Sequence, residues 1–334
     1  MRKTLFSPLF AISSVVLAAA TFQVQAAEKI TVALISTQAV EDTRKEWRPL
    51  LDDMSKAIGA PVDALVSTNY SEVVAAIRDG RAHVSWLGNK LALEAIEGDK
   101  AQVFAQVVKK DGSQGYKSVL IVPVNSPIRG LEDIVAKKGT YSFMNGDPKS
   151  TSGFLVPFYY AFSLKKITPD THFKSVVSGS HQKNFVAVAK GEVDLATNNT
   201  EDMERLQKEM PEEFKKVRVV WSSPIIPNDP LIYRSDLPDA MKGKIETFFL
   251  NYGKRSKEQG KILDEILKLS GFKKSTNAQL IPIADLELFS QLRRNQDDDK
   301  KSPAEKQKAA DALMSRFGSL SALLTMDRME KRGK

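Results

Sequence analysis

The sequence predicts an α/β protein built from two lobes, each a sheet covered by helices. The chain has 334 residues, which is more than one average domain and suits two of ordinary size. Two separate blocks alternate strand-like and helix-like patterns. Hydrophobic residues make up 42% and charged residues 27%, as in folded soluble proteins. The chain has no cysteine, which excludes disulfides and thiol catalysis.

The first block begins with a β-branched run and then alternates helix and strand. We expect strands at residues 30–36, 62–66 and 83–86, and helices at 40–58 and 71–79. Ser71 is the expected N-cap of the second helix, and Gly59 and Gly80 follow the helix ends. This βαβαβ order predicts a parallel sheet covered by helices.

The second block repeats the alternation. We expect strands at residues 117–122, 140–143, 173–177, 195–197 and 217–221, and helices at 151–164 and 182–190. The apolar strands near 119–123 and 219–226 are the expected crossings between the blocks. We therefore expect one lobe from residues 27–122 and 223–290, and the other from 123–222.

Both ends of the chain carry distinct patterns. Residues 1–26 indicate a signal peptide, with Arg2 and Lys3 before an apolar stretch and a small-residue site for cleavage near Ala26. Export is therefore expected, and no later run is long enough to span a bilayer. Residues 291–334 are the expected C-terminal helical extension, which includes an amphipathic helix at 303–329. A homodimer through this helix is one expectation.

The net charge is +8, but it does not indicate a nucleic-acid partner. Lysines and arginines are scattered among acids, and no basic run is interleaved with aromatic residues. The pattern is typical of a solvated surface with a mild attraction for anions.

The segment NGDPKSTSG, residues 145–153, lies between a strand and a helix and carries the strongest functional pattern. Ser150, Thr151 and Ser152 fall at the start of the helix, where unpaired N–H groups and a partial positive charge favour an oxyanion. Helix capping is the alternative, but one Ser or Thr suffices for it. The sequence lacks the G-x-x-x-x-G-K-[ST] and G-x-G-x-x-G patterns, so no nucleotide cofactor is expected.

Further candidates follow other strands, and loops after parallel strands share one edge of a sheet. His181 precedes a helix, and Glu201 and Asp229 place carboxylates that would attract an ammonium group. Tyr70 and Tyr116 lie in loops of the first block and could close over a small ligand. The alternatives are a surface or capping role for His181, a cap for Glu201, a turn for Asp229 and packing for the tyrosines. The three histidines have no metal-ligand spacing, so no metal is expected.

These segments resemble the phosphonate-binding proteins of ABC importers, from about residue 30 to 282. The specific motifs are NGDP-x-STSGFLVP from Asn145 and DLATNNTE from Asp194, supported by W-x-GN from Trp86 and DGS-x-GY from Asp111. The resemblance implies a periplasmic, non-enzymatic protein of the type II periplasmic-binding fold, with a ligand cleft between two lobes. Its implied partners are a small phosphonate and the membrane subunits of the importer.

The resemblance also implies roles for individual residues. The phosphonate oxygens would be held by Ser150, Thr151, Ser152, Tyr116 and His181, with Tyr70 closing the other side. Glu201 and Asp229 would receive the amine of 2-aminoethylphosphonate. Leu87 stands where a tyrosine is expected, which leaves the preference among organic groups open.

Two other functions stay open at this point. One is binding of a related oxyanion such as phosphite, phosphate or an alkylphosphonate, which would not use Glu201 and Asp229. The other is phosphoester hydrolysis, which needs a nucleophile beside a base or a metal site. The sequence shows no Ser-His-Asp order, paired-carboxylate motif or metal spacing that would support hydrolysis.

Overall fold

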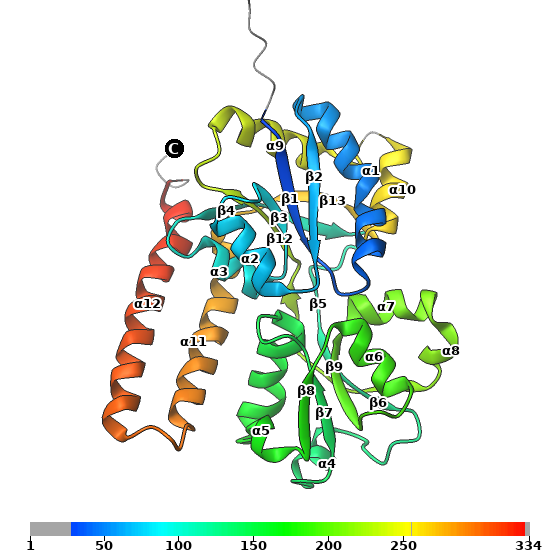
Figure 1. Ribbon diagram of the computed structural model, residues 1–334, viewed down its shortest axis with the longest axis vertical. Coiled ribbons are helices and arrows are strands. Elements are labelled where there is room, and N and C mark those ends of the chain that lie inside the picture. The colour runs from blue at the N-terminus through cyan, green and yellow to red at the C-terminus, as the bar shows by residue number, and fades with distance from the viewer. Residues whose placement is uncertain (1–27, 255, 331–334) are drawn as a thin grey trace, which may run out of the picture.

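The computed structural model describes residues 28–254 and 256–330. The chain forms two lobes, each with its own sheet, and a helical hairpin along one side (Figure 1). The predicted signal peptide, including the cleavage site near Ala26, lies outside the described residues.

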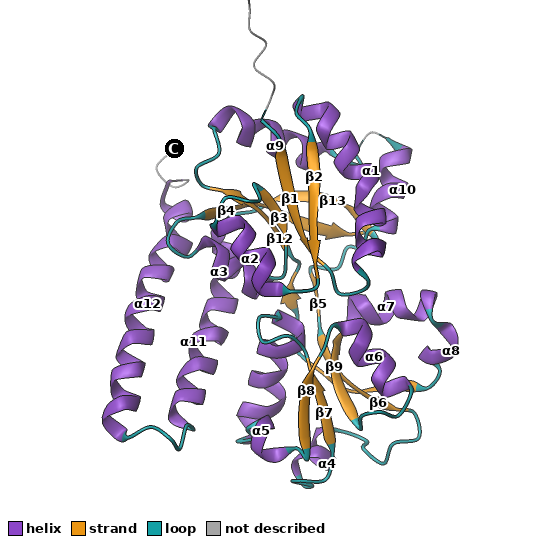
Figure 2. Ribbon diagram, in the orientation of Figure 1, coloured by secondary structure: helices purple, strands orange, loops and turns teal. Residues whose placement is uncertain are grey.

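Lobe 1 is built on a six-stranded mixed sheet in the order β13-β4-β12-β3-β1-β2. Its strands are β1 (Ile30–Ile35), β2 (Val62–Ser67), β3 (Val84–Trp86), β4 (Ala101–Lys109), β12 (Pro230–Arg234) and β13 (Leu269–Lys274). The first three strands are parallel, as the βαβαβ pattern predicts, whereas β12 pairs antiparallel with β3 and β4. The covering helices are α1 (Val40–Ile58), α2 (Tyr70–Arg78), α3 (Asn89–Ile96), α9 (Asp239–Asn251) and α10 (Lys257–Glu265) (Figure 2).

One predicted cap in lobe 1 is wrong. Asn69, not Ser71, caps α2, because its Oδ1 accepts hydrogen bonds from the N–H groups of Ser71 and Glu72 at 3.0 and 3.3 Å.

Lobe 2 has a five-stranded sheet in the order β10-β6-β9-β7-β8. Its strands are β6 (Ser118–Pro123), β7 (Ser142–Asn145), β8 (Ser175–Ser178), β9 (Leu195–Asn199) and β10 (Val217–Ser222). The helices are α4 (Leu131–Val135), α5 (Pro169–His172), α6 (His181–Ala189), α7 (Thr200–Glu209) and α8 (Pro211–Phe214). The helix predicted at 151–164 is irregular and contains the π-helical turns η1 (Thr151–Leu155) and η2 (Phe158–Phe162), followed by the 3₁₀ turn η3 (Ser163–Lys165).

The two lobes meet at a short antiparallel pair, β5 (Gly115–Tyr116) with β11 (Ile226–Pro227). A Cβ on Gly115 would lie 2.0 Å from the carbonyl oxygen of Ile226, so this close approach requires glycine. The whole of β6 pairs with β9 and β10 in lobe 2. The first crossing therefore lies before Ser118, and the predicted boundary at 122/123 is displaced by one strand.

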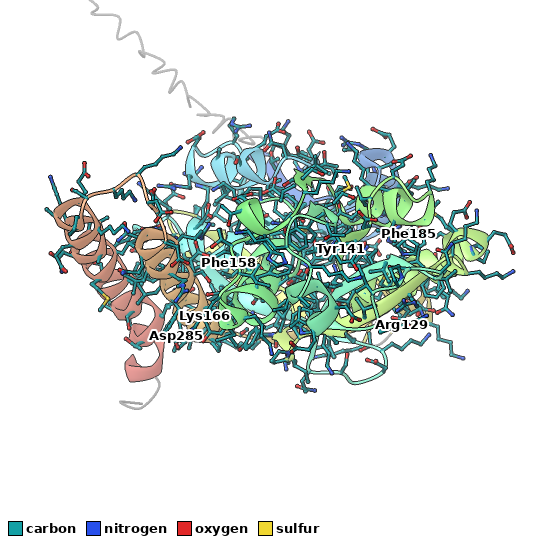
Figure 3. All side chains as sticks on the ribbon, turned by 90° about the horizontal axis from the view of Figure 1, so that it is seen from below. Arg129, Tyr141, Phe158, Lys166, Phe185 and Asp285 are labelled. Atoms are coloured by element: carbon teal, nitrogen blue, oxygen red, sulfur yellow. The ribbon has the colours of Figure 1, made fainter. Side chains whose placement is uncertain are left out.

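The C-terminal segment forms a helical hairpin of α11 (Ile281–Gln296) and α12 (Pro303–Glu330), preceded by the 3₁₀ turn η4 (Asn277–Leu280). The hairpin lies to one side of the lobes when the molecule is seen from below (Figure 3). Phe317, Leu320 and Leu324 of α12 are buried in the hydrophobic core of lobe 1. The extension predicted from residue 291 thus begins inside α11. None of the described helices is long and apolar enough to cross a membrane.

Candidate ligand-binding site between the lobes

A small cavity of about 40 Å³ lies between the two lobes. The structure brings all eight predicted site residues to its wall: Tyr70, Tyr116, Ser150, Thr151, Ser152, His181, Glu201 and Asp229. The wall also contains residues that the sequence interpretation did not select: Ile35, Thr37, Trp86, Gly88, Asn199, Asp202 and Leu267. Both lobes therefore contribute polar groups to one cavity.

The three hydroxyls at the start of η1 are each held by a neighbour. Ser150 is the N-cap, and its Oγ accepts a hydrogen bond from the N–H of Gly153 at 2.9 Å. The Oγ1 of Thr151 accepts a 2.9 Å bond from the backbone N–H of Lys90 in lobe 1. The Oγ of Ser152 lies 3.4 Å from Nε2 of His181. Capping thus explains only the first of the three hydroxyls, and the others are positioned by groups outside the helix.

Two glycines allow this helix start to form. The N–H of Gly146 donates to the carbonyl of Gly153 at 2.9 Å, and a Cβ on Gly146 would lie 2.6 Å from Cα of Gly153. A Cβ on Gly153 would lie 2.9 Å from Oγ of Ser150 and 3.2 Å from Cε1 of His181. The glycines therefore serve close approach of strand and helix, and larger residues would displace the hydroxyls.

Two nitrogens of residues in the cavity wall have no hydrogen-bond partner among the described residues. They are Nε1 of Trp86 and Nδ1 of His181, and both are buried. A buried polar group without a partner costs about 1–3 kcal/mol, so a ligand that engaged these nitrogens would remove a penalty. Burial lowers the pKa of His181, which favours the neutral imidazole. The sequence signal for Trp86 was the W-x-GN motif, which supported the family resemblance without giving Trp86 a role in the site.

The carboxyl group of Asp229 is held by donors of its own. Its Oδ1 accepts the hydroxyl of Tyr116 at 3.0 Å and the amide of Asn89 at 3.2 Å. Burial, together with the nearby charge of Glu201, raises the pKa of Asp229 well above its ordinary value. The single hydroxyl hydrogen of Tyr116 is engaged by Asp229. Its predicted role as a donor to the phosphonate therefore requires that this bond be exchanged.

Glu201 is also paired, with a lysine that the sequence analysis missed. The Nζ of Lys109, at the end of β4, lies 3.0 Å from Oε1 of Glu201 on α7. Burial raises the pKa of Glu201, and the positive charge of Lys109 acts against this rise. No pattern in the sequence connects the two residues, because they lie in different lobes.

Thr37 and Asp202 form a direct contact between the lobes beside the cavity. The hydroxyl of Thr37 donates to Oδ1 of Asp202 at 2.9 Å, and the carbonyl of Thr37 accepts from the N–H of Gln182 at 3.2 Å. Asp202 is further paired with Arg205 at 2.9 Å. Thr37 of lobe 1 is thus joined to two helices of lobe 2.

Leu87, the residue that departs from the family pattern, does not line the cavity. Its side chain is fully buried in the core of lobe 1. Among the described residues, no group of three or more histidines and acids is arranged to hold a metal ion.

Comparisons with known proteins agree with this architecture. Residues 32–280 match the family described as "ABC transporter, phosphonate, periplasmic substrate-binding protein". The phosphonates-binding periplasmic protein of Escherichia coli (strain K12) is 40% identical over 287 residues, which span 86% of this chain and 83% of the relative.

Two solved structures extend the comparison. A binding protein component of an ABC phosphonate transporter from Pseudomonas aeruginosa is 38% identical, with a TM-score of 0.82 over 92% of this chain and 99% of that chain. PhnD1 from Prochlorococcus marinus (MIT 9301), solved in complex with methylphosphonate, shares the fold at 23% identity, with a TM-score of 0.69 over 77% of this chain and 96% of that chain. This chain belongs to the family of periplasmic substrate-binding proteins of ABC phosphonate transporters.

Proposed function

We propose that this protein binds 2-aminoethylphosphonate in the cavity between its lobes and delivers it for import. The observation that carries the proposal is the composition of one cavity wall. The wall combines two sets of residues. The donor set is uncharged and consists of Ser150, Thr151, Ser152 and His181, and the acid set consists of Glu201 and Asp229. A zwitterion with an anionic group and an amine matches both sets.

The donor set suits a tetrahedral oxyanion. Removing a phosphonate from water leaves each oxygen in need of a donor, and the start of η1 offers hydroxyls together with the unpaired N–H groups of a helix terminus. The N-terminus of α3 also reaches the cavity through Gly88. Partial positive charge from these helix ends favours an anion.

The acid set suits the ligand amine. Asp229 and Glu201 influence each other electrostatically, and both side chains are only partly exposed at the cavity. Burial disfavours the charged form of these carboxyl groups, and an ammonium group placed between them would favour that charged form.

Binding would proceed by closure of the lobes about the β5–β11 connection. The contact of Thr37 with Asp202 and that of Lys90 with Thr151 both join the lobes, so closure gains bonds from the protein as well as from the ligand. In the cell, we propose export with cleavage near Ala26 and delivery to the membrane subunits of the importer. A homodimer through α12 remains part of this proposal.

The experiment is calorimetric titration of the mature, ligand-stripped protein with 2-aminoethylphosphonate, ethylphosphonate and phosphate in parallel. Preferential binding of the aminophosphonate supports the proposal. Equal affinity for ethylphosphonate would agree with the role of the donor set but would show that Glu201 and Asp229 do not recognise an amine. Binding of phosphate alone, or of none of the three, would overturn the proposal.

One observation favours a second candidate, a phosphonate that lacks an amine. Glu201 already has Lys109 as a partner, and Asp229 already accepts two hydrogen bonds. The protein itself therefore supplies partners to both members of the acid set. The ethylphosphonate titration above distinguishes this candidate.

A further inference from the structure

Lys109 is a buried cation that pairs with an acid of the cavity wall from the opposite lobe. Its side chain is 6% exposed and that of Glu201 is 14% exposed. Besides Oε1 of Glu201 at 3.0 Å, its Nζ donates to the carbonyl oxygen of Leu267 at 2.5 Å. Lys109 thus binds one residue of α7 and one residue of the loop between α10 and β13.

The backbone at Leu267 is held in an uncommon conformation. Leu267 and Lys268 have φ angles of 51° and 53°, in the left-handed region that residues other than glycine rarely adopt. Such conformations persist where the surrounding structure requires them, and they cluster at ligand clamps. Here the residue with this conformation, Leu267, lines the cavity, and its carbonyl oxygen accepts the hydrogen bond from Lys109.

The charges around the acid set can be counted from these contacts. Two carboxyl groups, Glu201 and Asp229, face one ammonium group, that of Lys109. A buried charge requires a partner, and removal of one member of a buried pair is strongly unfavourable. Glu201 has its partner in the protein. Asp229 has the hydroxyl of Tyr116 and the amide of Asn89, and it can hold a proton instead of a charge.

We propose that Lys109 is a specificity-determining residue: a built-in counter-cation for Glu201 that lets the cleft close on phosphonates with no amino group. This inference rests on the proposed function, because it concerns how strongly the site distinguishes an aminoalkylphosphonate from an alkylphosphonate. With Lys109 present, an alkylphosphonate buries no unpaired carboxylate at Glu201. Without Lys109, only a ligand that carries an ammonium group supplies the missing charge.

The test is the ratio of the two dissociation constants, ethylphosphonate to 2-aminoethylphosphonate, in the wild type and in Lys109→Met. We expect the ratio to rise by about tenfold or more in the variant, because ethylphosphonate would then close the cleft over an unpaired Glu201. Lys109→Arg keeps the charge and is expected to keep the ratio near the wild-type value. An unchanged ratio in Lys109→Met overturns the inference.

Lys268 provides a matched control, because its partner Glu204 lies one helical turn after Glu201 on α7. Lys268 forms an ion pair with Glu204 of α7, also between the lobes, but with the two side chains 43% and 47% exposed. Lys268→Met removes a contact between the lobes without changing the charge at the cavity, so both affinities are expected to change by the same factor. If Lys109→Met also shifts both affinities equally, Lys109 is only a contact between the lobes.

A second variant keeps the test decisive if Lys109→Met does not fold. Lys109→Met with Glu201→Gln removes both buried charges, and we expect the ratio to return to the wild-type value or lower. A ratio that stays high in this double variant overturns the inference. The wild-type titrations judge the proposed function separately, since they show whether the amine is recognised at all.

Discussion

The hydroxyl of Tyr116 donates a 3.0 Å hydrogen bond to Oδ1 of Asp229, which joins the connection between the lobes to the cavity wall. Tyr116 lies on β5, and Asp229 immediately precedes β12. The amide of Asn89 is a second donor to the same oxygen, at 3.2 Å. The carboxyl group of Asp229 is therefore oriented by donors of the protein itself, and such preorganisation lowers the cost of binding.

Replacement of Tyr116 by Phe tests whether this hydroxyl serves the acid or the phosphonate. We expect Tyr116→Phe to lower the affinity for 2-aminoethylphosphonate by about tenfold and that for ethylphosphonate by much less. The reason is that the hydroxyl donates its hydrogen bond to Asp229 and not to the phosphonate. Calorimetric titration with both ligands measures the two changes. A similar loss of affinity for both ligands would show that the hydroxyl of Tyr116 donates to the phosphonate instead.

The raised pKa of Asp229 predicts proton release when an aminophosphonate binds. Burial and the charge of Glu201 keep the free carboxyl protonated to a higher pH than usual, and an adjacent ammonium group would lower its pKa again. Affinity for 2-aminoethylphosphonate should therefore rise as pH rises through the pKa of the free state. Calorimetry in two buffers of different ionisation enthalpy measures the released protons. Ethylphosphonate is the control, since it shares the titration of the phosphonate group, and equal release with both ligands contradicts the prediction.

Loss of hydroxyls from the donor set should weaken every phosphonate. We expect Ser150→Ala combined with Thr151→Ala to reduce the binding free energy by at least about 2 kcal/mol, because hydrogen bonds to a charged group contribute roughly 1.5–3 kcal/mol each. Calorimetry gives the change. Ser256→Ala is the matched control, because Ser256 also caps a helix, by accepting from the N–H of Gln259, but does not line the cavity. Unchanged affinity in the double variant would show that these hydroxyls do not bind the phosphonate.

The contact between Thr37 and Asp202 should set the equilibrium between open and closed lobes. Thr37→Val keeps the shape of the side chain and removes its hydrogen bond to a buried carboxylate. We expect dissociation constants for amino- and alkylphosphonates to rise by the same factor, about tenfold, because the closed state becomes less populated. Calorimetry with both ligands, with small-angle scattering of the free protein, checks this. A change confined to one ligand would mean that Thr37 contacts the ligand.

The C-terminal helix should matter for the stability of lobe 1. Leu320 is 2% exposed and belongs to the core of that lobe. We expect Leu320→Ala to lower the free energy of unfolding by about 2–5 kcal/mol, as for other buried leucines. Met314 on the same helix is 56% exposed, so Met314→Ala is the control and should have little effect. Denaturant unfolding measures both, and a neutral Leu320→Ala would show that α12 is dispensable for folding.

Local patterns in the sequence predicted much of the architecture. The β-branched runs and helical spacing of the first block predicted the parallel strands β1, β2 and β3, because strand and helix periods are properties of neighbouring residues. The segment from Asn145 to Gly153 predicted a helix start with three hydroxyls beside a strand end, and the structure has it. The other five candidates came from their positions in loops beside strands, the family resemblance implied their roles, and all eight predicted residues line the cavity.

The sequence by itself thus determined the strand and helix patterns, eight residues of the cavity wall and the family. Only the tertiary structure decided which groups pair across the cavity. Thr37 and Asp202 are 165 residues apart, and the lysine that pairs with Glu201 comes from the other lobe. Such pairs depend on how the lobes meet, and β6 had to be assigned to lobe 2 by its hydrogen bonds. Residue type and spacing do not encode these distances, because burial and charge pairing arise only when separate segments are packed together.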